Sequence, residues 1–276
     1  MSPPSPTWEG GPPPALPPAR AGDRWRLVGR LLALGLCLAT GLLVLGLVSA
    51  AERLCGRRDR RWSVHVPRLV SRAAVAILGI AYHVEGRPMT HPGAVVANHG
   101  SWLDILALNA AVNVFFVAKA EVAGWPGIGG LARAAGTVFI RRDRREAAQQ
   151  AQLFEDRIRA GHRLLFFPEG TSTDTQRILP FKSTLFQAFF TEDLKERMWV
   201  QPVTLRYIAP EGEDPRFYGW WGDMPLGPHL RKVLVAKRGG RIVLDFHPAL
   251  RVRDQANRKS LAAACEEAVR HGGLAL

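Results

Sequence analysis

The sequence predicts an α/β fold: a mostly parallel sheet flanked by helices and preceded by an N-terminal membrane helix. Short aliphatic runs alternate with helical patterns from residue 93 onward, which is typical of a parallel sheet covered on both faces. A stretch without charged residues (31–51) comes before them. Of the 276 residues, 47% are hydrophobic, so the chain can bury a large core.

Residues 1–24 are predicted to form a disordered tail, because prolines crowd this segment and leave little apolar surface to bury. Residues 25–52 are predicted to form a transmembrane or membrane-inserted helix, since the uncharged run can cross a hydrocarbon core of about 30 Å. A cleaved signal peptide is the alternative, but its apolar region would be unusually long and its start is proline-rich rather than basic.

Seven arginines follow this helix closely and four precede it. The positive-inside rule therefore places the following domain in the cytoplasm and the protein in the inner (cytoplasmic) membrane. Residues 53–85 are predicted to be a basic linker with an interfacial helix, because the apolar stretch 69–84 is interrupted by Arg72 and is too short to span. A buried core helix is the alternative for this stretch.

The domain that carries the chemistry is predicted at residues 86–276. Its strands are expected at 93–98, 112–118, 136–141, 162–168, 199–207 and 241–247, and its helices near 101–111, 124–134, 144–160 and 254–271. In such folds catalytic groups lie where strands end and helices begin.

The formal net charge of +13 indicates an anionic partner, such as a membrane surface, a nucleic acid or a phosphate-bearing substrate. Charge alone does not choose among them. The spacing of Cys37, Cys55 and Cys265 is not typical of a metal site or of disulfides. We therefore predict no metal and interpret the three thiols as reduced.

The stretch NHGSWLD (98–104) follows the first of these predicted strands. His99 is expected in the connecting loop and Asp104 in the first helical turn, which can fold the carboxylate back toward the imidazole. A carboxylate on one ring nitrogen makes the other nitrogen a general base for a hydroxyl. The pattern Ser101-x-x-Asp104 fits a helix capping box equally well, and this heptapeptide alone leaves both interpretations open.

A second candidate is LLFFPEGTSTD (164–174), in which a buried strand runs into a turn that contains Glu169, Gly170 and Thr171. Glycine lets the backbone approach a ligand, and successive amides at such a turn can meet an oxyanion or a phosphate. An ordinary turn, with Glu169 as a helix-start charge, is the alternative.

Taken together, four blocks resemble the glycerolipid acyltransferase family, of the 1-acylglycerol-3-phosphate acyltransferase type. They are NHGSWLD (98–104), GTVFIRR (136–142), FPEGTST (167–173) and VQPVTLRY (200–207), with FVAKAE (116–121) between the first two. The resemblance implies an O-acyltransferase that moves a fatty acyl group from a thioester of acyl carrier protein (acyl-ACP) or coenzyme A (acyl-CoA) to a lyso-lipid hydroxyl at the membrane. It implies no cofactor.

The resemblance also assigns roles to residues. His99 would be the general base and Asp104 its orienting carboxylate. Arg142, Glu169, Gly170, Thr171 and Lys119 would bind substrate. The fourth block is expected to shape the acyl pocket.

Many members of the family have arginine after Glu-Gly-Thr, where it helps to bind the acceptor's phosphate, but this chain has Ser172. The expected acceptor is 1-acyl-sn-glycerol-3-phosphate, giving phosphatidate in phospholipid biosynthesis. Lyso-ornithine lipid, which lacks a phosphate, is the alternative, because residues 169–186 also resemble bacterial members that acylate it.

A hypothesis of a different class is a non-catalytic membrane tether that binds anionic lipid through its arginines. The variant His99→Ala separates the two, because it should abolish acyl transfer and leave membrane binding intact. Nucleic acid is not expected as a partner of the enzyme.

Overall fold

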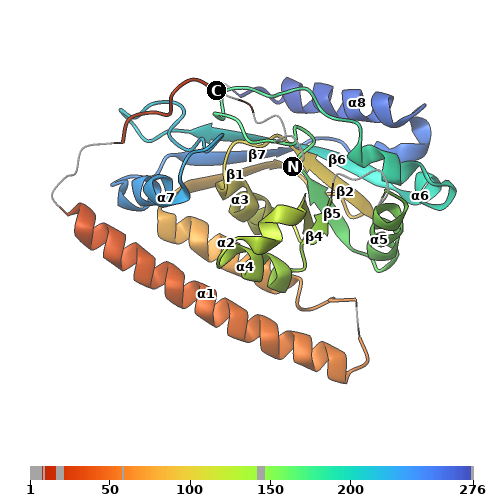
Figure 1. The fold of residues 1–276 in the computed structure, drawn as a ribbon, viewed down its shortest axis with the longest axis horizontal. Helices are drawn as coiled ribbons and strands as arrows, with labels where there is room; N and C mark the ends of the chain where they lie inside the picture. Colours follow the sequence, from red (N-terminus) through yellow and green to blue (C-terminus); the bar gives the residue numbers. More distant parts are fainter. Residues whose placement is uncertain (1–7, 9, 17–21, 58, 142–146, 275–276) are drawn as a thin grey trace.

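A computed structural model describes residues 8, 10–16, 22–57, 59–141 and 147–274. Its centre is an eight-stranded mixed sheet in the order β1-β7-β6-β2-β5-β3-β4, with β8 paired to β6 (Figure 1). The strands are β1 (Ala81–Gly86), β2 (Gly93–Ala97), β3 (Phe115–Lys119), β4 (Val138–Ile140), β5 (Arg163–Phe166), β6 (Trp199–Ile208), β7 (Arg241–Phe246) and β8 (Leu250–Arg251). The predicted α/β architecture is confirmed, and all six expected strands are present with shifted ends.

The helices form a layer on each face of the sheet. They are α1 (Asp23–Leu54), α2 (His65–Leu78), α3 (Leu103–Ala111), α4 (Ile128–Ala135), α5 (Ala147–Arg159), α6 (Glu192–Arg197), α7 (Leu226–Val235) and α8 (Arg258–His271). Apolar side chains of α2, α3 and α7 form one core with the sheet, and those of α5, α6 and α8 form the other. Successive residues of β2 alternate between the two cores, Val95 facing the first and Val96 the second, as the pleat requires.

The apolar stretch 69–84, predicted to be a single interfacial or core helix, contains two elements. Gly79 ends α2 with a φ of 71°, a left-handed conformation that glycine adopts without strain. The chain then enters β1, which pairs in parallel with β7 at the edge of the sheet. The sheet therefore begins at Ala81, before the predicted domain start at residue 86.

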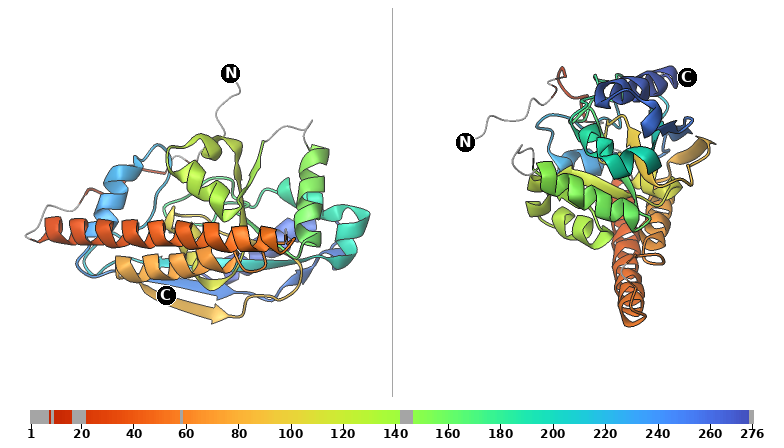
Figure 2. Two further views of the ribbon diagram at one scale, coloured as in Figure 1. Left: turned by 90° about the horizontal axis from the view of Figure 1, so that it is seen from below. Right: turned by 90° about the vertical axis from the view of Figure 1, so that its right-hand side faces the viewer.

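The long helix α1 lies along the outside of the domain, beside α2 (Figure 2). Near its N-terminal end, Arg26 donates to the carbonyl oxygen of Val235 at 3.0 Å, and Arg30 to that of Leu234 at 2.8 Å. These carbonyls end α7, where a cation is favoured by the helix dipole. Near the C-terminal end of α1, the buried carboxylate of Glu52 accepts the backbone amides that lead into α2, including that of Trp62 at 2.6 Å.

The described part of the N-terminal tail contacts the domain, although the whole tail was expected to be disordered. The indole of Trp8 lies 5.9 Å from the ring of Trp221, between ring centroids, and the guanidinium of Arg177 lies 4.7 Å over the Trp8 ring. Arg216 donates to the carbonyl oxygen of Pro12 at 3.3 Å. Residues 1–7, 9 and 17–21 of the tail lie outside the described part of the chain.

Candidate active site

The predicted motifs meet at one edge of the sheet because four neighbouring strands are parallel. β2 pairs with β5, β5 with β3, and β3 with β4, all in the same direction. The carboxyl ends of these strands therefore share an edge, which is where ligands bind in open α/β sheets. His99 follows β2, Glu169 follows β5, and Lys119 ends β3.

The imidazole of His99 and the carboxylate of Asp104 are in direct contact. Nδ1 of His99 lies 2.6 Å from Oδ2 of Asp104, and the Asp104 side chain is fully buried while 22% of the His99 side chain is exposed. Because an ionised carboxylate only accepts, Nδ1 carries the proton and Nε2 holds the lone pair. The ring also stacks on Phe167, with centroids 4.1 Å apart, so its orientation is fixed.

The capping box, the alternative interpretation of the first motif, forms only in part, because the Ser101 hydroxyl accepts the amide of Leu103 rather than that of Asp104. Oδ2 of Asp104 also accepts the backbone amides of Gly100 at 2.9 Å and Ser101 at 3.0 Å, so the carboxylate stabilises the start of α3 while it binds His99. The helix starts at Leu103 rather than at the expected position 101. These amide bonds fix Asp104 independently of the histidine.

Distant segments hold the backbone of this loop. The side chain of Asn98 bonds both backbone groups of Leu205, at 2.7 and 2.9 Å, and so continues the pairing of β2 with β6 beyond the end of β2. The amides of Thr173 and Trp220 donate to the carbonyls of His99 and Gly100, each at 2.9 Å. A Cβ atom at Gly100 would lie 2.6 Å from the Thr175 methyl group, so glycine is required there.

Glu169 lies on the buried side of His99, against its backbone, and not at the exposed edge of its ring. One carboxylate oxygen accepts the backbone amide of His99 and the other that of Leu179, both at 2.7 Å, and the residue is 1% exposed. Burial raises the pKa of Glu169 to about 8, because the lost hydration outweighs the two amide donors that favour the ionised form. This placement fits a residue that organises the two loops better than the expected role in binding substrate.

The remaining predicted residues have different placements. The Gly170 amide donates to the Phe167 carbonyl at 3.1 Å and closes the turn, so other donors of this loop would have to meet an oxyanion. Thr171 and Lys119 are half-buried at the same edge of the sheet. Arg142 lies outside the described residues, just after β4.

Two residues that contribute contacts at this site were not predicted from the sequence. The hydroxyl of Tyr207, at the end of the fourth block, donates a short hydrogen bond to Oδ1 of Asp104. Asp174, which is 2% exposed, pairs with Arg177 at 2.9 Å on the loop that contacts His99. The order of β2 and β6 in the sheet, which brings Tyr207 close, is not readable from the spacing of the motifs.

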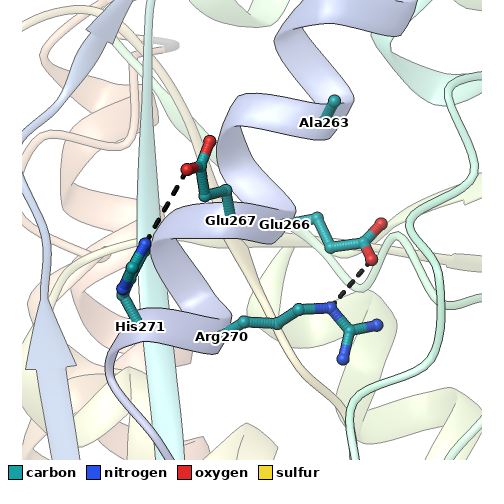
Figure 3. Close-up of a pocket in the computed structure, with 5 residues that line it drawn as sticks. All are labelled: Ala263, Glu266, Glu267, Arg270 and His271. Carbon is teal, nitrogen blue, oxygen red and sulfur yellow. Dashed lines mark hydrogen bonds and ion pairs between the residues drawn. The ribbon is translucent and has the colours of Figure 1, made fainter.

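Among the described residues, no group of three or more His, Cys, Asp or Glu side chains could hold a metal ion. A surface hollow on α8 is lined by ion pairs within that helix, Glu266 with Arg270 at 2.9 Å and Glu267 with His271 at 3.7 Å (Figure 3). None of its lining residues belongs to the predicted motifs.

Comparison with known proteins agrees with this geometry. Residues 79–206 match the family described as Acyltransferase. A lyso-ornithine lipid O-acyltransferase of Rhodobacter capsulatus is 58% identical over 268 residues, which are 97% of each chain. A 1-acyl-sn-glycerol-3-phosphate acyltransferase of Neisseria gonorrhoeae is 33% identical over 205 residues, which are 73% of this chain and 78% of the relative.

The fold has a solved counterpart. The crystal structure of the 1-acyl-sn-glycerophosphate acyltransferase PlsC from Thermotoga maritima matches with a TM-score of 0.63 and 21% identity, covering 91% of this chain and 95% of that chain. At this identity the match shows the fold alone. From its motifs, its relatives and its fold, this chain belongs to the acyltransferase family, as an enzyme of the glycerolipid type that its sequence resembles.

Proposed function

We propose that this O-acyltransferase acylates the hydroxyl of lyso-ornithine lipid. The contact between His99 and Asp104 carries the proposal for the chemistry, and two observations support this acceptor. The Rhodobacter capsulatus relative, which matches nearly the whole chain, has that name. Ser172 replaces the arginine that would bind a phosphate, and the nearby ionic groups Asp174 and Arg177 form a pair of opposite charges. An amino-acid head group offers charges of both signs, which suits such a pair better than a phosphate does.

The reaction follows from the dyad. Nε2 of His99 takes the proton of the acceptor hydroxyl as its oxygen attacks the thioester carbonyl carbon. Asp104 holds the ring and stabilises the imidazolium that forms. The tetrahedral intermediate then collapses, the carbon–sulfur bond breaks, and the thiolate takes the proton from His99. Such general base catalysis contributes about 10²–10⁴ in rate.

The runner-up acceptor is 1-acyl-sn-glycerol-3-phosphate, after the Neisseria gonorrhoeae relative. Arg142, Lys119 and Arg177 are the cations that would meet its phosphate. The donor is a thioester of acyl carrier protein or coenzyme A, both of which are acidic partners for a chain with a net charge of +13.

The deciding experiment presents labelled acyl thioester and equal amounts of the two lysolipids to membranes that contain the protein, and identifies the product by mass spectrometry. Acylated ornithine lipid is expected to dominate for wild type and for the exposed-histidine control His83→Ala, and to vanish for His99→Ala. Predominant phosphatidate would refute the proposed acceptor. Thiol release without any acceptor would indicate hydrolysis rather than transfer.

The enzyme is proposed to bind the membrane through α1. In the described part of the chain, α1 is the one helix long and apolar enough to cross a bilayer. Its most exposed apolar side chains recur at helical spacing and form one stripe, of Trp25, Leu32, Leu36, Leu43, Leu47 and Leu54. This stripe would face lipid.

Both ends of α1 are bonded to the same domain, at α7 and at the start of α2. A helix that crossed the bilayer would carry one of these contacts to the opposite side. We therefore expect α1 to lie within one leaflet, with the catalytic domain on the same side. The arginines on both sides of α1 would then face one membrane surface, and their charge favours the anionic cytoplasmic leaflet.

Thiol labelling in sealed inverted vesicles tests this arrangement. Cys55 is exposed just after α1, and Arg24→Cys places a second thiol at an exposed position near its start. A membrane-impermeant maleimide should label both from the same side. Labelling from opposite sides would show that α1 spans the bilayer.

A further inference from the structure

The two oxygens of the Asp104 carboxylate have different partners. Oδ2 accepts from Nδ1 of His99 and from the amides of Gly100 and Ser101. Oδ1 accepts from the hydroxyl of Tyr207. The tyrosine thus lies on the far side of the carboxylate from the imidazole, and the three side chains form a line from the solvent-facing ring into the core.

We propose that Tyr207 is a positioning residue of the acyl-transfer reaction, whose hydroxyl draws charge from Asp104 and so sets how readily His99 takes the acceptor's proton. The proposal deepens the function proposed above and rests on His99 as the base. It also gives the fourth sequence block a role at the dyad rather than in the acyl pocket alone.

The placement of Tyr207 is enforced by the sheet. Asn98, next to His99, grips both backbone groups of Leu205 and so fixes the register of β6 against the catalytic loop. Tyr207 follows two residues later, on the same face of the strand, and both side chains belong to the core on the α3 side. The two hydrogen bonds between Asn98 and Leu205 therefore also determine where Tyr207 lies relative to His99.

The hydroxyl is kept as a donor at every pH of interest. Tyr207 is 5% exposed, and its burial beside the charge of Asp104 raises the pKa of Tyr207 well above its ordinary value. A donor on a carboxylate stabilises the charged form and makes it a weaker attractor of a proton. Removing the donor should therefore make Asp104 more basic and favour imidazolium at His99.

The charged and titratable groups that face this line are few among the described residues. The carboxyl group of Glu169, on the buried side of His99, interacts electrostatically with Asp104, and Tyr82 and Tyr218 lie beside Tyr207. The hydroxyl of Tyr82 donates to the carbonyl of Ala107 at 2.7 Å, on the same helix as Asp104 but away from its carboxylate. Tyr82→Phe is therefore a matched control that removes a tyrosine hydroxyl from α3 without touching the dyad.

The test follows the His99 ring by NMR across a pH series in detergent-solubilised full-length protein with labelled histidine, assigned by the loss of one signal in His99→Ala. In Tyr207→Phe the pH midpoint for protonation of the ring should rise by about one unit. The acid limb of the rate profile should move to higher pH with it. At pH values below the wild-type midpoint kcat should therefore fall by up to about tenfold, with little change in the acceptor KM and no comparable loss well above the midpoint. Tyr82→Phe should match wild type.

A second variant covers the case in which Tyr207→Phe fails to fold. Incorporating 3-fluorotyrosine at position 207 keeps the packing but makes the hydroxyl a stronger donor, so the midpoint should move down instead of up. Opposite shifts in the two variants, or the downward shift alone if the phenylalanine variant unfolds, would support the proposal.

A merely structural tyrosine gives a different pattern. Loss of thermal stability with an unmoved His99 midpoint in Tyr207→Phe, or an unmoved midpoint with fluorotyrosine, would overturn the proposal. The NMR measurement needs no turnover. If wild type transfers no acyl group to either lysolipid while the midpoint still follows residue 207, the proposed function fails and the coupling stands.

Discussion

Replacing Asp104 by asparagine removes the charge of the dyad and preserves its shape. Three donors meet Oδ2, whereas the hydroxyl of Tyr207 meets Oδ1. The oxygen of the introduced amide should therefore turn toward the three donors, and its NH2 toward Tyr207, whose hydroxyl can also accept. His99 would keep its orientation and its Nδ1 proton, so the variant isolates the effect of the negative charge.

The rate loss can be worked out from this geometry. The proton-bearing nitrogen lies 2.6 Å from the carboxylate oxygen, which puts the two charge centres about 4 Å apart in the intermediate. At an effective dielectric constant of about 20 their attraction is about 4 kcal/mol. Part of it is already present in the ground state as a hydrogen bond. With about 1.4 kcal/mol for each tenfold change, kcat should fall by about 10²–10³.

The assay is single-turnover transfer of a labelled acyl group to the preferred lysolipid, with the acceptor KM measured in parallel. The surface variant Asp156→Asn, whose carboxylate binds Gln152 on the exposed side of α5, controls for the substitution itself. A loss under tenfold in folded protein would refute the reasoning that the charge stabilises imidazolium. A loss as complete as that of His99→Ala would refute the assignment of the amide orientation.

Three further outcomes are expected. Burial raises the pKa of Glu169 from about 4.5 in the unfolded chain to about 8. The neutral side chain therefore stabilises the fold fully below pH 4.5, and this stabilisation is lost as pH rises through about 8. Glu169→Gln should flatten the dependence of the melting temperature on pH over that window, and an unchanged slope would contradict this. Ser172→Arg should shift the competition between the two lysolipids toward the phosphate-bearing acceptor, and an unmoved product ratio would argue against residue 172 as a determinant. Arg30→Ala, which removes donors to the end of α7, should lower the melting temperature by about 5 °C, whereas the exposed control Arg24→Ala should leave it unchanged.

The parts of the fold and site that depend on short-range pattern could be predicted from the sequence. The strands read as aliphatic runs because β2 and most of β6 are buried on both faces. His99 and Asp104 belong to one loop and the helix turn that follows it, so their contact depends on five residues of local geometry.

What the sequence could not reveal depends on which strands become neighbours. Tyr207 reaches Asp104, and Glu169 reaches the His99 amide, only because β6 and β5 flank β2 on either side. Edge strand β1 was missed for two reasons. Its residues are partly exposed and several are polar, so they do not read as an aliphatic run. It also follows the apolar residues of α2 closely, with only Gly79 to mark the end of the helix. Arg26 and Arg30 counted only as topology signals in the sequence, but they also cap α7.

The docked Trp8 has a practical consequence for handling this enzyme. Its indole packs on Arg177 and Trp221, in the two loops whose backbones hold His99 and Gly100. An affinity tag fused to the N-terminus would extend a segment that touches the catalytic loops, so the length and charge of the tag would affect those loops. Purification handles are better placed after α8, and kinetic data from N-terminally tagged protein should be compared with those from protease-trimmed samples.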